Sequence, residues 1–281
     1  MDEAFRVLHL FNTAGIASII AKYQRLLFGW NVLVYTRRRS DLSGFAAAYR
    51  EHTRYCFPDT AFAIQVKSLF LASLADIVHV HDSDKTAYRI RKINPGKKIV
   101  LHYHGSRIRG KWERRRKYWS AVDAIVVSTR DLLEGAPEKA EYLPNPVDTQ
   151  LFRDMGLPRK PVALLPIKRR RMHLWRYVKP IAEEMRERFG VDYEVWFCDR
   201  KPVPYVEMPR FLNRYEWVFD IPHGYSEGEI IRNTFSTLGL QSLACGCKVC
   251  TEWSNRVFTE LPGEHKPENV VKKLHEIYSH I

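Results

Sequence analysis

Residues 216–251 have the pattern of a β-strand, a helix and a second β-strand, which strongly limits the possible folds. The segment Glu216–Ile221 is aromatic and β-like, and a glycine-bearing loop follows it. A helical pattern begins at about Glu229, with apolar positions at Ile230, Phe235, Leu238, Leu240 and Leu243. It ends at Cys245-Gly246, before a strand from Lys248 to Thr251. Such a βαβ unit presents backbone N–H groups and a helix dipole that favour a phosphate or an electron-rich sugar.

The rest of the chain repeats this alternation. Strand-like runs occur at 5–11, 31–36, 76–82, 98–103, 121–129 and 193–197, and helical patterns at 16–28, 60–74, 85–92, 174–189 and 268–281. With 281 residues, 45% of them apolar, the chain can form two α/β domains with a core each. Two prolines around Asn145 favour an extended linker, and we place the domain boundary near Asp154 to Pro161.

The composition argues against membrane-spanning and secreted proteins. No window approaches 18 uncharged apolar residues, so no transmembrane helix is expected. The N-terminus is acidic and then β-like, unlike a signal peptide. The odd number of cysteines, five, favours free thiols in a reducing cytoplasm. The spacing Cys245-x-Cys247-x-x-Cys250 is not that of a zinc knuckle, and we expect no metal there.

The net charge of +13 requires an explanation. Basic surfaces attract nucleic acid, anionic membranes or phosphorylated substrates, and charge alone does not choose among them. An Arg-rich composition with few Gln would also suit a thermophile. The segment 106–120 interleaves Arg and Lys with Trp112, Tyr118 and Trp119, as in interfacial or polyanion-binding segments. The alternative is a solvated helix face whose aromatic side chains pack inward.

Residues with ligand-binding character follow several of the expected strands. Gly15 ends the turn after the first strand, where it either lets the backbone approach a ligand or simply forms a tight turn. His104 follows strand 98–103, and ligands bind at the carboxyl ends of parallel strands; a loop-stabilising role is the alternative. The segment 82–84, Asp-Ser-Asp, looks like a D-x-D metal motif but fits better as a strand end and helix N-cap.

Several motifs occur in an order shared with a known family. Residues 241–249 read Q-S-L-A-C-G-C-K-V, and residues 141–148 read E-Y-L-P-N-P-V-D. Earlier segments read D-I-V-H-V-H at 76–81, H-Y-H-G at 102–105 and A-V-D-A-I-V-V-S at 121–128. Together they resemble retaining glycosyltransferases with the GT-B fold, notably family 4, whose donor motif is E-x-F-G-x-x-x-x-E-A-x-A-x-G-x-P-V. The matched segments span about residue 5 to residue 250.

The resemblance implies a GT-B fold, in which two Rossmann-like domains with parallel sheets face a central cleft. Residues 1–154 would form the N-terminal acceptor-side domain, and residues 155–281 the C-terminal nucleotide-sugar donor domain. Gly15 matches a loop that lies at the cleft in the family, and His104 matches a histidine that faces the donor sugar. Because the chain is shorter than typical members, we expect loops or the C-terminal return helix to be trimmed.

The resemblance also implies donor-binding and catalytic residues. Where the family holds the donor diphosphate with G-R-x-x-x-x-K-G, this chain has a cation cluster with Lys168, Arg169 and Arg171 as candidate ligands. The two motif glutamates fall on Asn233 and Gln241, which are amides. Gln241 can still hydrogen-bond a ribose, and Asn233 can hold a sugar hydroxyl with less electrostatic help. The carboxylates nearby on the same loop, which are candidates to replace the missing pair, are Glu227 and Glu229.

We therefore expect a metal-independent glycosyltransferase without a cofactor, moving a sugar from a nucleotide-diphosphate donor to an acceptor with retention. The implied partners are a nucleotide sugar and a saccharide or lipid-linked acceptor, with peripheral contact with an anionic membrane. A degenerate, non-catalytic relative that binds a nucleotide sugar or a polyanion is the alternative, favoured by the two amides and the missing Gly-Arg pair. Nucleic-acid binding ranks last because no nucleic-acid motif is present.

Overall fold

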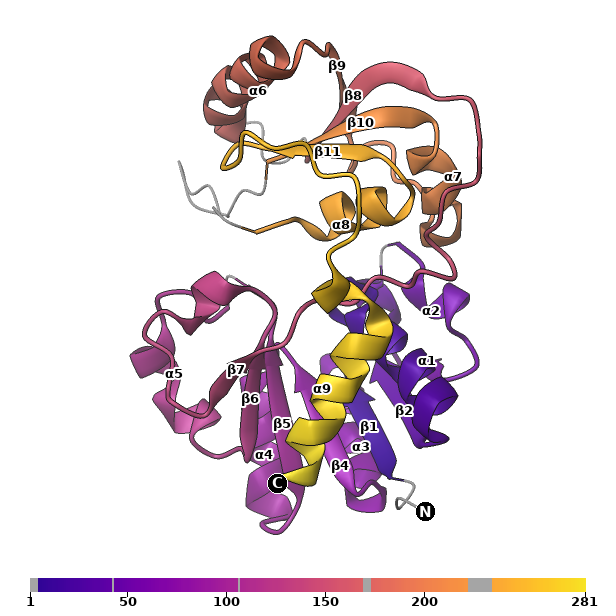
Figure 1. Cartoon of the computed structure of the whole chain (residues 1–281). Coiled ribbons are helices and arrows are strands. Elements are labelled where there is room, and N and C mark those ends of the chain that lie inside the picture. The colour runs from indigo at the N-terminus through magenta and orange to yellow at the C-terminus, as the bar shows by residue number, and fades with distance from the viewer. Residues whose placement is uncertain (1–4, 42, 106, 169–172, 222–233) are drawn as a thin grey trace. The chain divides into compact units, whose positions relative to one another are not determined.

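The computed structural model describes residues 5–41, 43–105, 107–168, 173–221 and 234–281 (Figure 1). The chain divides into two compact units. Unit 1 comprises residues 1–146 and 267–281, and unit 2 comprises residues 147–266. Each unit contains a parallel sheet with helices packed against it, which confirms the predicted α/β class and the two Rossmann-like domains.

The sheet of unit 1 has seven parallel strands in the order β3-β2-β1-β4-β5-β6-β7. Their bounds are β1 Arg6–Leu10, β2 Asn31–Thr36, β3 Thr53–Tyr55, β4 Ile77–His81, β5 Lys98–Tyr103, β6 Ala124–Val127 and β7 Ala140–Tyr142. The chain moves from β1 to one edge and then returns to the other side of β1 with β4. The loops after β1 and β4 therefore diverge, and such a switch point is where open α/β sheets bind ligands.

Helices cover both faces of this sheet (Figure 1). On one face α1 (Ile16–Phe28) packs against the C-terminal α9 (Pro267–Ser279). On the other face lie α3 (Ala61–Leu74), α4 (Asp84–Ile93) and α5 (Trp112–Trp119), while the short α2 (Phe45–Ala48) follows β2. The core between the sheet and α3 to α5 includes Leu8, Leu10, Ile64, Val80, Ile90, Leu101 and Trp112.

The units differ from the predicted domains at both ends of unit 2. Unit 2 begins at Val147 rather than near Asp154, and residues 267–281 belong to unit 1. The C-terminal helix returns because its apolar side chains need a surface: Tyr278 of α9 stacks on Trp30 with ring centroids 5.9 Å apart. The return helix is thus present rather than trimmed, and it contains the buried residues Val270, Val271, Leu274 and Ile277.

In its described residues, unit 2 has four parallel strands in the order β11-β10-β8-β9. Their bounds are β8 Lys160–Ile167, β9 Tyr193–Phe197, β10 Tyr215–Asp220 and β11 Lys248–Thr251, and the helices are α6 Trp175–Phe189, α7 Met208–Leu212 and α8 Thr237–Ala244. Val178 and Met185 of α6 pack with Leu165 and Phe219 in the core. Because β9 and β10 lie on opposite sides of β8, this unit has its own switch point between β8 and β10.

Helix α8 is shorter than the sequence pattern predicts. Ser236 has extended backbone angles and is the N-cap, and its hydroxyl accepts a hydrogen bond from the Gly239 N–H at 3.0 Å. Phe235 was predicted on the helix but precedes it, because its ring packs against Trp253 and Phe258 with centroids 5.5 and 4.9 Å away. The predicted start at Glu229 lies outside the described residues.

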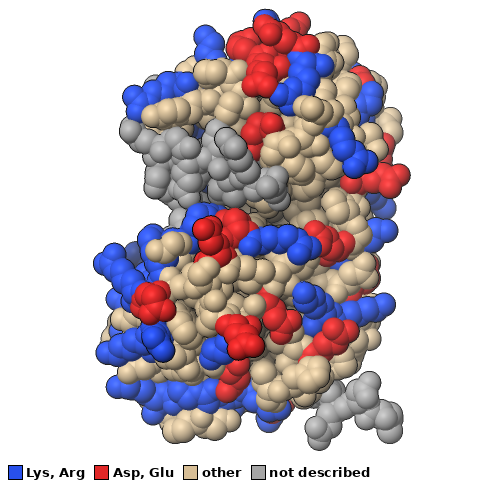
Figure 2. All heavy atoms as spheres, turned by 60° about the vertical axis from the view of Figure 1, so that its left-hand side comes forward, with Lys and Arg blue, Asp and Glu red and all other residues tan. Residues whose placement is uncertain are grey.

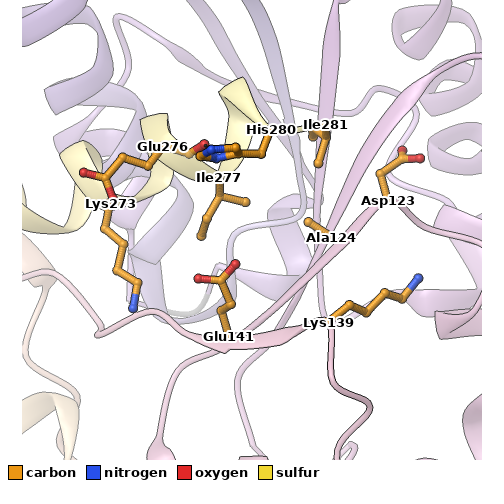
Figure 3. A pocket seen from close by; sticks show the side chains of 9 residues that line it. All are labelled: Asp123, Ala124, Lys139, Glu141, Lys273, Glu276, Ile277, His280 and Ile281. Atoms are coloured by element: carbon orange, nitrogen blue, oxygen red, sulfur yellow. Dashed lines mark hydrogen bonds between the residues drawn. The ribbon is translucent and has the colours of Figure 1, made fainter.

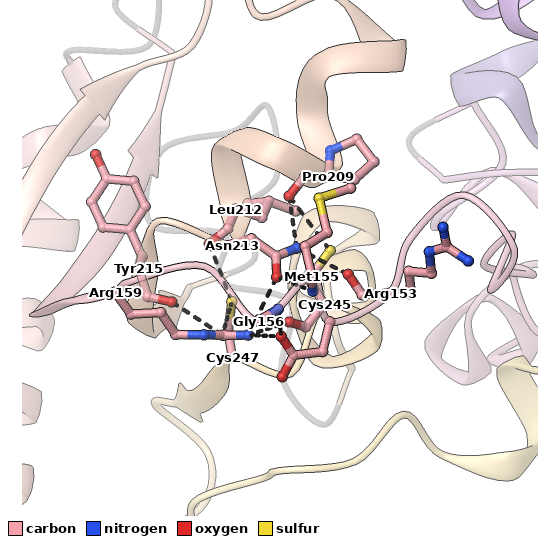
Figure 4. A network of polar contacts seen from close by, with 11 residues as sticks. Arg153, Met155, Gly156, Arg159, Pro209, Leu212, Asn213, Tyr215, Cys245 and Cys247 are labelled. Atoms are coloured by element: carbon pink, nitrogen blue, oxygen red, sulfur yellow. Dashed lines mark hydrogen bonds and ion pairs between the residues drawn. The ribbon is translucent and has the colours of Figure 1, made fainter.

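A polar network fixes the C-terminal end of α8 (Figure 4). Arg159 donates to the Cys245 carbonyl at 2.7 Å and pairs with Asp154 at 2.8 Å. A cation on the last carbonyls of a helix complements its dipole. The buried Asn213, directly after α7, accepts a hydrogen bond from the Met155 N–H at 2.8 Å. The network thereby joins α7 and α8 to the segment that enters β8.

Candidate functional site

At the switch point of unit 1, the carboxylate of Asp82 connects the segments that follow neighbouring strands. The Thr13 hydroxyl, in the loop after β1, donates to one oxygen of Asp82 at 3.2 Å. The backbone N–H of His104, after β5, donates to the other oxygen at 2.9 Å. Asp82 itself follows β4, so it links the carboxyl ends of three neighbouring strands. The sequence predicts Asp82 as a strand end, or as part of a D-x-D motif, and not these contacts, because its partners lie far away in the sequence.

The other acid of the predicted D-x-D segment has a structural partner. Asp84 is buried and forms an ion pair with Arg115 of α5 at 2.9 Å. Its second contact is the Tyr103 hydroxyl, which donates at 3.2 Å. The N-cap of α4 is Ser83, as the predicted strand-end and N-cap interpretation requires. Asp84 is therefore committed to holding α5 on the sheet.

The backbone at this edge of unit 1 adopts conformations that are common at binding sites. Phe11, Ala14 and Asp82 have positive φ values of 68°, 51° and 55°. Each such residue costs about 1–3 kcal/mol and occurs mainly where the surrounding structure holds it for function. Gly15, with φ of 78°, is required sterically, because a Cβ there would lie 2.3 Å from the Phe45 ring. This contact supports the tight-turn interpretation, and a ligand role for Gly15 stays a prediction.

His104 lies directly after β5, at the predicted edge, but both of its ring nitrogens contact protein groups. Nε2 is 2.9 Å from Nδ1 of His81, and Nδ1 is 2.6 Å from the Ser128 hydroxyl oxygen. Burial lowers the pKa of His104, although Asp82 and Asn145 oppose this effect. The imidazole would have to break an internal hydrogen bond to contact a sugar, so its site role stays a prediction.

A row of histidines, which was not predicted from the sequence, ends at His104. The two H-x-H patterns, at 79–81 and 102–104, lie on or directly after the adjacent strands β4 and β5. Alternate residues of a strand face the same side, so each pattern places two imidazoles on one face of the sheet. That spacing is the signal from which the row could have been predicted.

The switch point of unit 2 combines a cation and a buried acid. Lys168 follows β8 directly, and Asp220 is the last residue of the adjacent β10. Asp220 is completely buried and accepts a hydrogen bond from the Ser236 N–H, just before α8, at 2.8 Å. Burial raises the pKa of Asp220 to about 6, although the Ser236 hydrogen bonds oppose the shift. An anion at the N-terminus of α8 would therefore meet a carboxylate that already occupies this position.

Of the remaining residues predicted for the donor site, the structure describes Gln241. Gln241 lies on α8 and is buried, with 6% of its surface exposed. Its role toward a ribose stays a prediction. The candidates that lie outside the described residues are Arg169, Arg171, Glu227, Glu229 and Asn233.

The cysteines near α8 are packing residues in the structure. Cys245, Cys247 and Cys250 are buried free thiols. Burial raises the pKa of Cys247 to about 11 and that of Cys250 to about 12. Burial therefore favours the thiol form of both side chains over the thiolate.

A pocket of about 310 Å³ lies at the other edge of the unit 1 sheet (Figure 3). Asp123 and Lys139, which line it, come directly before β6 and β7, so the pocket lies at amino ends of strands. Lys139 donates to the Val122 carbonyl at 2.6 Å, and Asp123 pairs with Arg91 at 2.5 Å. These polar groups serve the fold, and the edge is opposite to the one where open α/β sheets bind ligands.

Two Rossmann-like units with parallel sheets define the GT-B fold class, and solved structures confirm it. Anabaena HepE in complex with UDP has a TM-score of 0.55 and 12% identity, over 96% of this chain and 90% of HepE. UDP-GlcNAc 2-epimerase from Methanocaldococcus jannaschii has a TM-score of 0.55 and 10% identity, over 98% of this chain and 99% of the epimerase. At these identities the likeness shows the fold alone.

The sequence also matches a family model. Residues 19–151 match the model of Glycosyltransferase Family 4, which confirms the resemblance inferred from the motifs. This match lies almost entirely in unit 1. No curated protein matches the chain significantly. Among the described residues, no helix has both the length and the apolar character needed to cross a membrane.

Proposed function

We propose that this protein is a glycosyltransferase that moves a sugar from a nucleotide-diphosphate donor to an acceptor, with retention and without a metal or cofactor in the reaction. The observation that carries the proposal is the match of residues 19–151 to Glycosyltransferase Family 4, in a chain with the GT-B fold. HepE, which shares this fold, was crystallised with UDP, and this supports a nucleotide donor. An epimerase shares the fold too, so only the family match favours transfer over epimerisation.

The proposed donor site lies at the switch point of unit 2. Lys168 binds the diphosphate together with Arg169 and Arg171, because cations neutralise the charge that develops on the leaving diphosphate. Gln241 binds the ribose through its amide. The groups assigned to the transferred sugar are His104, Glu227, Glu229 and Asn233, and Gly15 is assigned to donor binding.

A non-catalytic relative that binds a nucleotide sugar is the second candidate. It is favoured by Asp220, whose buried carboxylate already lies at the N-terminus of α8. The amides at Asn233 and Gln241, in place of carboxylates, point the same way. This candidate predicts that a nucleoside diphosphate binds and that no sugar is transferred.

Replacing Lys168 by alanine is expected to weaken nucleoside-diphosphate binding about tenfold, since a charge-assisted contact contributes about 1.5 kcal/mol or more. Calorimetry with UDP, GDP, ADP and dTDP measures the dissociation constants. Lys160→Ala is the matched control, because Lys160 begins the same strand at its opposite end and pairs with Glu194 at 3.0 Å. Absence of diphosphate binding by the unmodified protein, or equal losses in both variants, would contradict the assigned site.

Transfer of an isotope-labelled sugar from the donor that binds then separates the two candidates. Turnover in the unmodified protein supports the enzyme, and binding without turnover over a broad acceptor panel supports the second candidate. Glu227→Ala and Glu229→Ala are expected to reduce transfer if these carboxylates replace the missing pair. Full transfer by both variants would refute that role.

We also propose that unit 1 contacts an anionic membrane through a surface formed by α3 and α4. On α3, Phe62, Val66, Phe70 and Leu74 recur every four residues and are 78%, 49%, 64% and 53% exposed. The exposed cations of α4 are Lys85, Arg89 and Lys92, and Arg89 donates to Gln65 of α3 at 2.8 Å. Figure 2 shows Lys and Arg side chains, with acidic ones among them, along the displayed side of unit 1. Exposed apolar side chains flanked by cations fit an anionic lipid surface.

This surface differs from the one that the sequence suggested. The aromatic residues of segment 106–120 pack inward: Trp112 is buried and donates to the Leu132 carbonyl at 3.0 Å, and Trp119 donates to the Trp112 carbonyl at 2.7 Å. The cations of α5 still adjoin α4, because Lys92 and Lys117 lie 5.1 and 5.7 Å from the centroid of the Tyr88 ring. The apolar part of the surface therefore comes from α3 and the basic part from α4 and α5.

Cosedimentation with vesicles containing phosphatidylglycerol tests this contact. Lys85→Gln with Lys92→Gln is expected to weaken binding about fivefold for each lysine removed, as each contributes about 1 kcal/mol near an anionic surface. Phe62→Ser with Phe70→Ser is expected to abolish binding, whereas Leu26→Ser, at an exposed position on α1, is the control. Equal binding to neutral phosphatidylcholine vesicles, or no effect of either double variant, would refute the contact.

A further inference from the structure

Five histidines form a continuous row on the face of the unit 1 sheet that α1 and α9 cover. His9 comes from β1, His79 and His81 from β4, His102 from β5, and His104 follows β5. The strand register pairs His9 with His79 and His81 with His102. The first four are completely or almost completely buried. Such a concentration of buried imidazoles needs hydrogen-bond or metal partners for its ring nitrogens.

Within the described residues, some ring nitrogens of the row have no hydrogen-bond partner. Nε2 of His9 lies 2.8 Å from Oε1 of Gln24, and Nδ1 of His9 lies 3.1 Å from Nε2 of His81. Nδ1 of His79 lies 2.6 Å from the Tyr278 hydroxyl, but Nε2 of His79 has no hydrogen-bond partner within the described part of the chain. An unsatisfied polar atom on a completely buried side chain is costly, and it points to a missing ligand.

We propose that His9, His79 and His81 bind a first-row transition-metal ion, for which Zn²⁺ is the best match. Each of the three offers one ring nitrogen, and these nitrogens lie within 4.8 Å of one another. The second nitrogen of each ring has an orienting partner: Gln24 for His9, the Tyr278 hydroxyl for His79, and His104 for His81 at 2.9 Å. Such outer partners fix the tautomer and direction of metal-binding imidazoles.

The donor set decides the kind of ion. Three imidazoles without a carboxylate or thiolate suit zinc, copper or nickel and not magnesium or calcium. All three imidazoles are buried, and metal binds an imidazole in its neutral form.

The geometry needs only a local adjustment. Nitrogens bound at about 2.0–2.1 Å to one tetrahedral Zn²⁺ are about 3.4 Å apart, and those of His9 and His81 are already 3.1 Å apart. The ligand nitrogen of His79 lies within 4.8 Å of these two, so the three nitrogens have to move closer together to bind one ion. The ion takes the place of the proton that lies between His9 and His81, and this proton moves to Nδ1 of His81. The proton that His104 shares with His81 then moves to the side of His104 that faces Ser128. The Ser128 hydroxyl can then donate to the Tyr103 carbonyl, 3.2 Å away.

A second triad, His81, His102 and His104, shares one ligand with the first, and its nitrogens also lie within 4.8 Å of one another. We favour the first triad because all three of its residues are buried, whereas His104 is half-buried and adjoins the Asp82 carboxylate. The favoured site lies beneath α9, whose Tyr278 holds His79. The ion would therefore stabilise the docking of the C-terminal helix and take no part in the proposed transfer reaction.

To test this, the full chain is unfolded in denaturant in the presence of a chelator and is then refolded with Co²⁺ or Zn²⁺. Bound metal is measured by atomic emission spectrometry. We expect one ion per chain, the visible absorption of tetrahedral Co²⁺, a rise in Tm of about 5 °C or more, and slower hydrogen exchange in α9. Less than one tenth of an ion per chain, with an unchanged Tm, would overturn the proposal without any variant.

Variants then locate the site. His79→Gln and His9→Gln are expected to lose the Co²⁺ absorption and the metal-dependent rise in Tm, whereas His52→Gln keeps both. His52 is the matched control, as it is buried in the same unit and contacts the Ser18 carbonyl at 3.1 Å, outside the row. Circular dichroism confirms that each variant is folded. Loss of binding in His102→Gln but not in His79→Gln would place the ion in the second triad and overturn this assignment.

Discussion

Replacing Gly239 by alanine is expected to lower the free energy of unfolding of unit 2 by about 3 kcal/mol. A Cβ at this position would lie 2.1 Å from one carboxylate oxygen of Asp220 and 2.6 Å from its Cγ. Asp220 is completely buried, so its short side chain has little room to move. Overpacking costs about 1–3 kcal/mol, and displacing the carboxylate from the Ser236 N–H adds about 1–3 kcal/mol. Urea unfolding, followed by hydrogen exchange in α8 and β10, measures the change.

Two further variants show whether the clash is the cause. Gly263→Ala is the control in the same unit, because within the described part of the chain no atom beyond its two sequence neighbours lies within 4 Å of a Cβ built there. Asp220→Ala removes the clashing carboxylate, so the double variant with Gly239→Ala should be more stable than the sum of the two single effects implies. Additive effects, or a Gly239→Ala variant as stable as the unmodified protein, would contradict the close approach of α8 to β10.

The elements of the fold were predictable where local pattern determines them. The helix 16–28 and the strands 31–36 and 248–251 have the predicted bounds, because apolar periodicity and flanking glycines agree there. The start of α8 was not predictable, because Phe235 continues a helical pattern in the sequence while its ring packs against Trp253. The tertiary packing of one aromatic ring therefore outweighs the local preference for helix.

The site was predictable only as positions along strands. Lys168 and His104 follow strands, as the motif order indicated, because the carboxyl ends of parallel strands meet at one edge. The contacts of Asp82 with Thr13, and of Asp220 with Ser236, depend on which strands are neighbours and in which register. A single sequence does not contain that pairing directly. The histidine row was missed for the same reason, since its members are aligned only when β1, β4 and β5 lie side by side.

Raising the pH from 4 to 7 is expected to lower the free energy of unfolding of unit 2 by roughly 2–3 kcal/mol through Asp220 alone. Burial raises the pKa of this carboxyl from 3.8 to about 6, against the opposing hydrogen bonds of Ser236. The folded state therefore holds the proton more tightly than the unfolded state does. The contribution is complete below pH 3.8 and is lost as the pH rises through about 6.

Asp220→Asn isolates this effect, because the amide stays neutral and its oxygen can still accept a hydrogen bond from Ser236. The free energy of unfolding of the variant, minus that of the unmodified protein, should grow by roughly 2–3 kcal/mol from pH 4 to pH 7. Urea titrations at several pH values measure this difference, and Asp192→Asn, at an exposed position of the same unit, should show no such growth. A constant difference would mean that Ser236 and the N-terminus of α8 stabilise the ionised carboxylate enough to offset its burial.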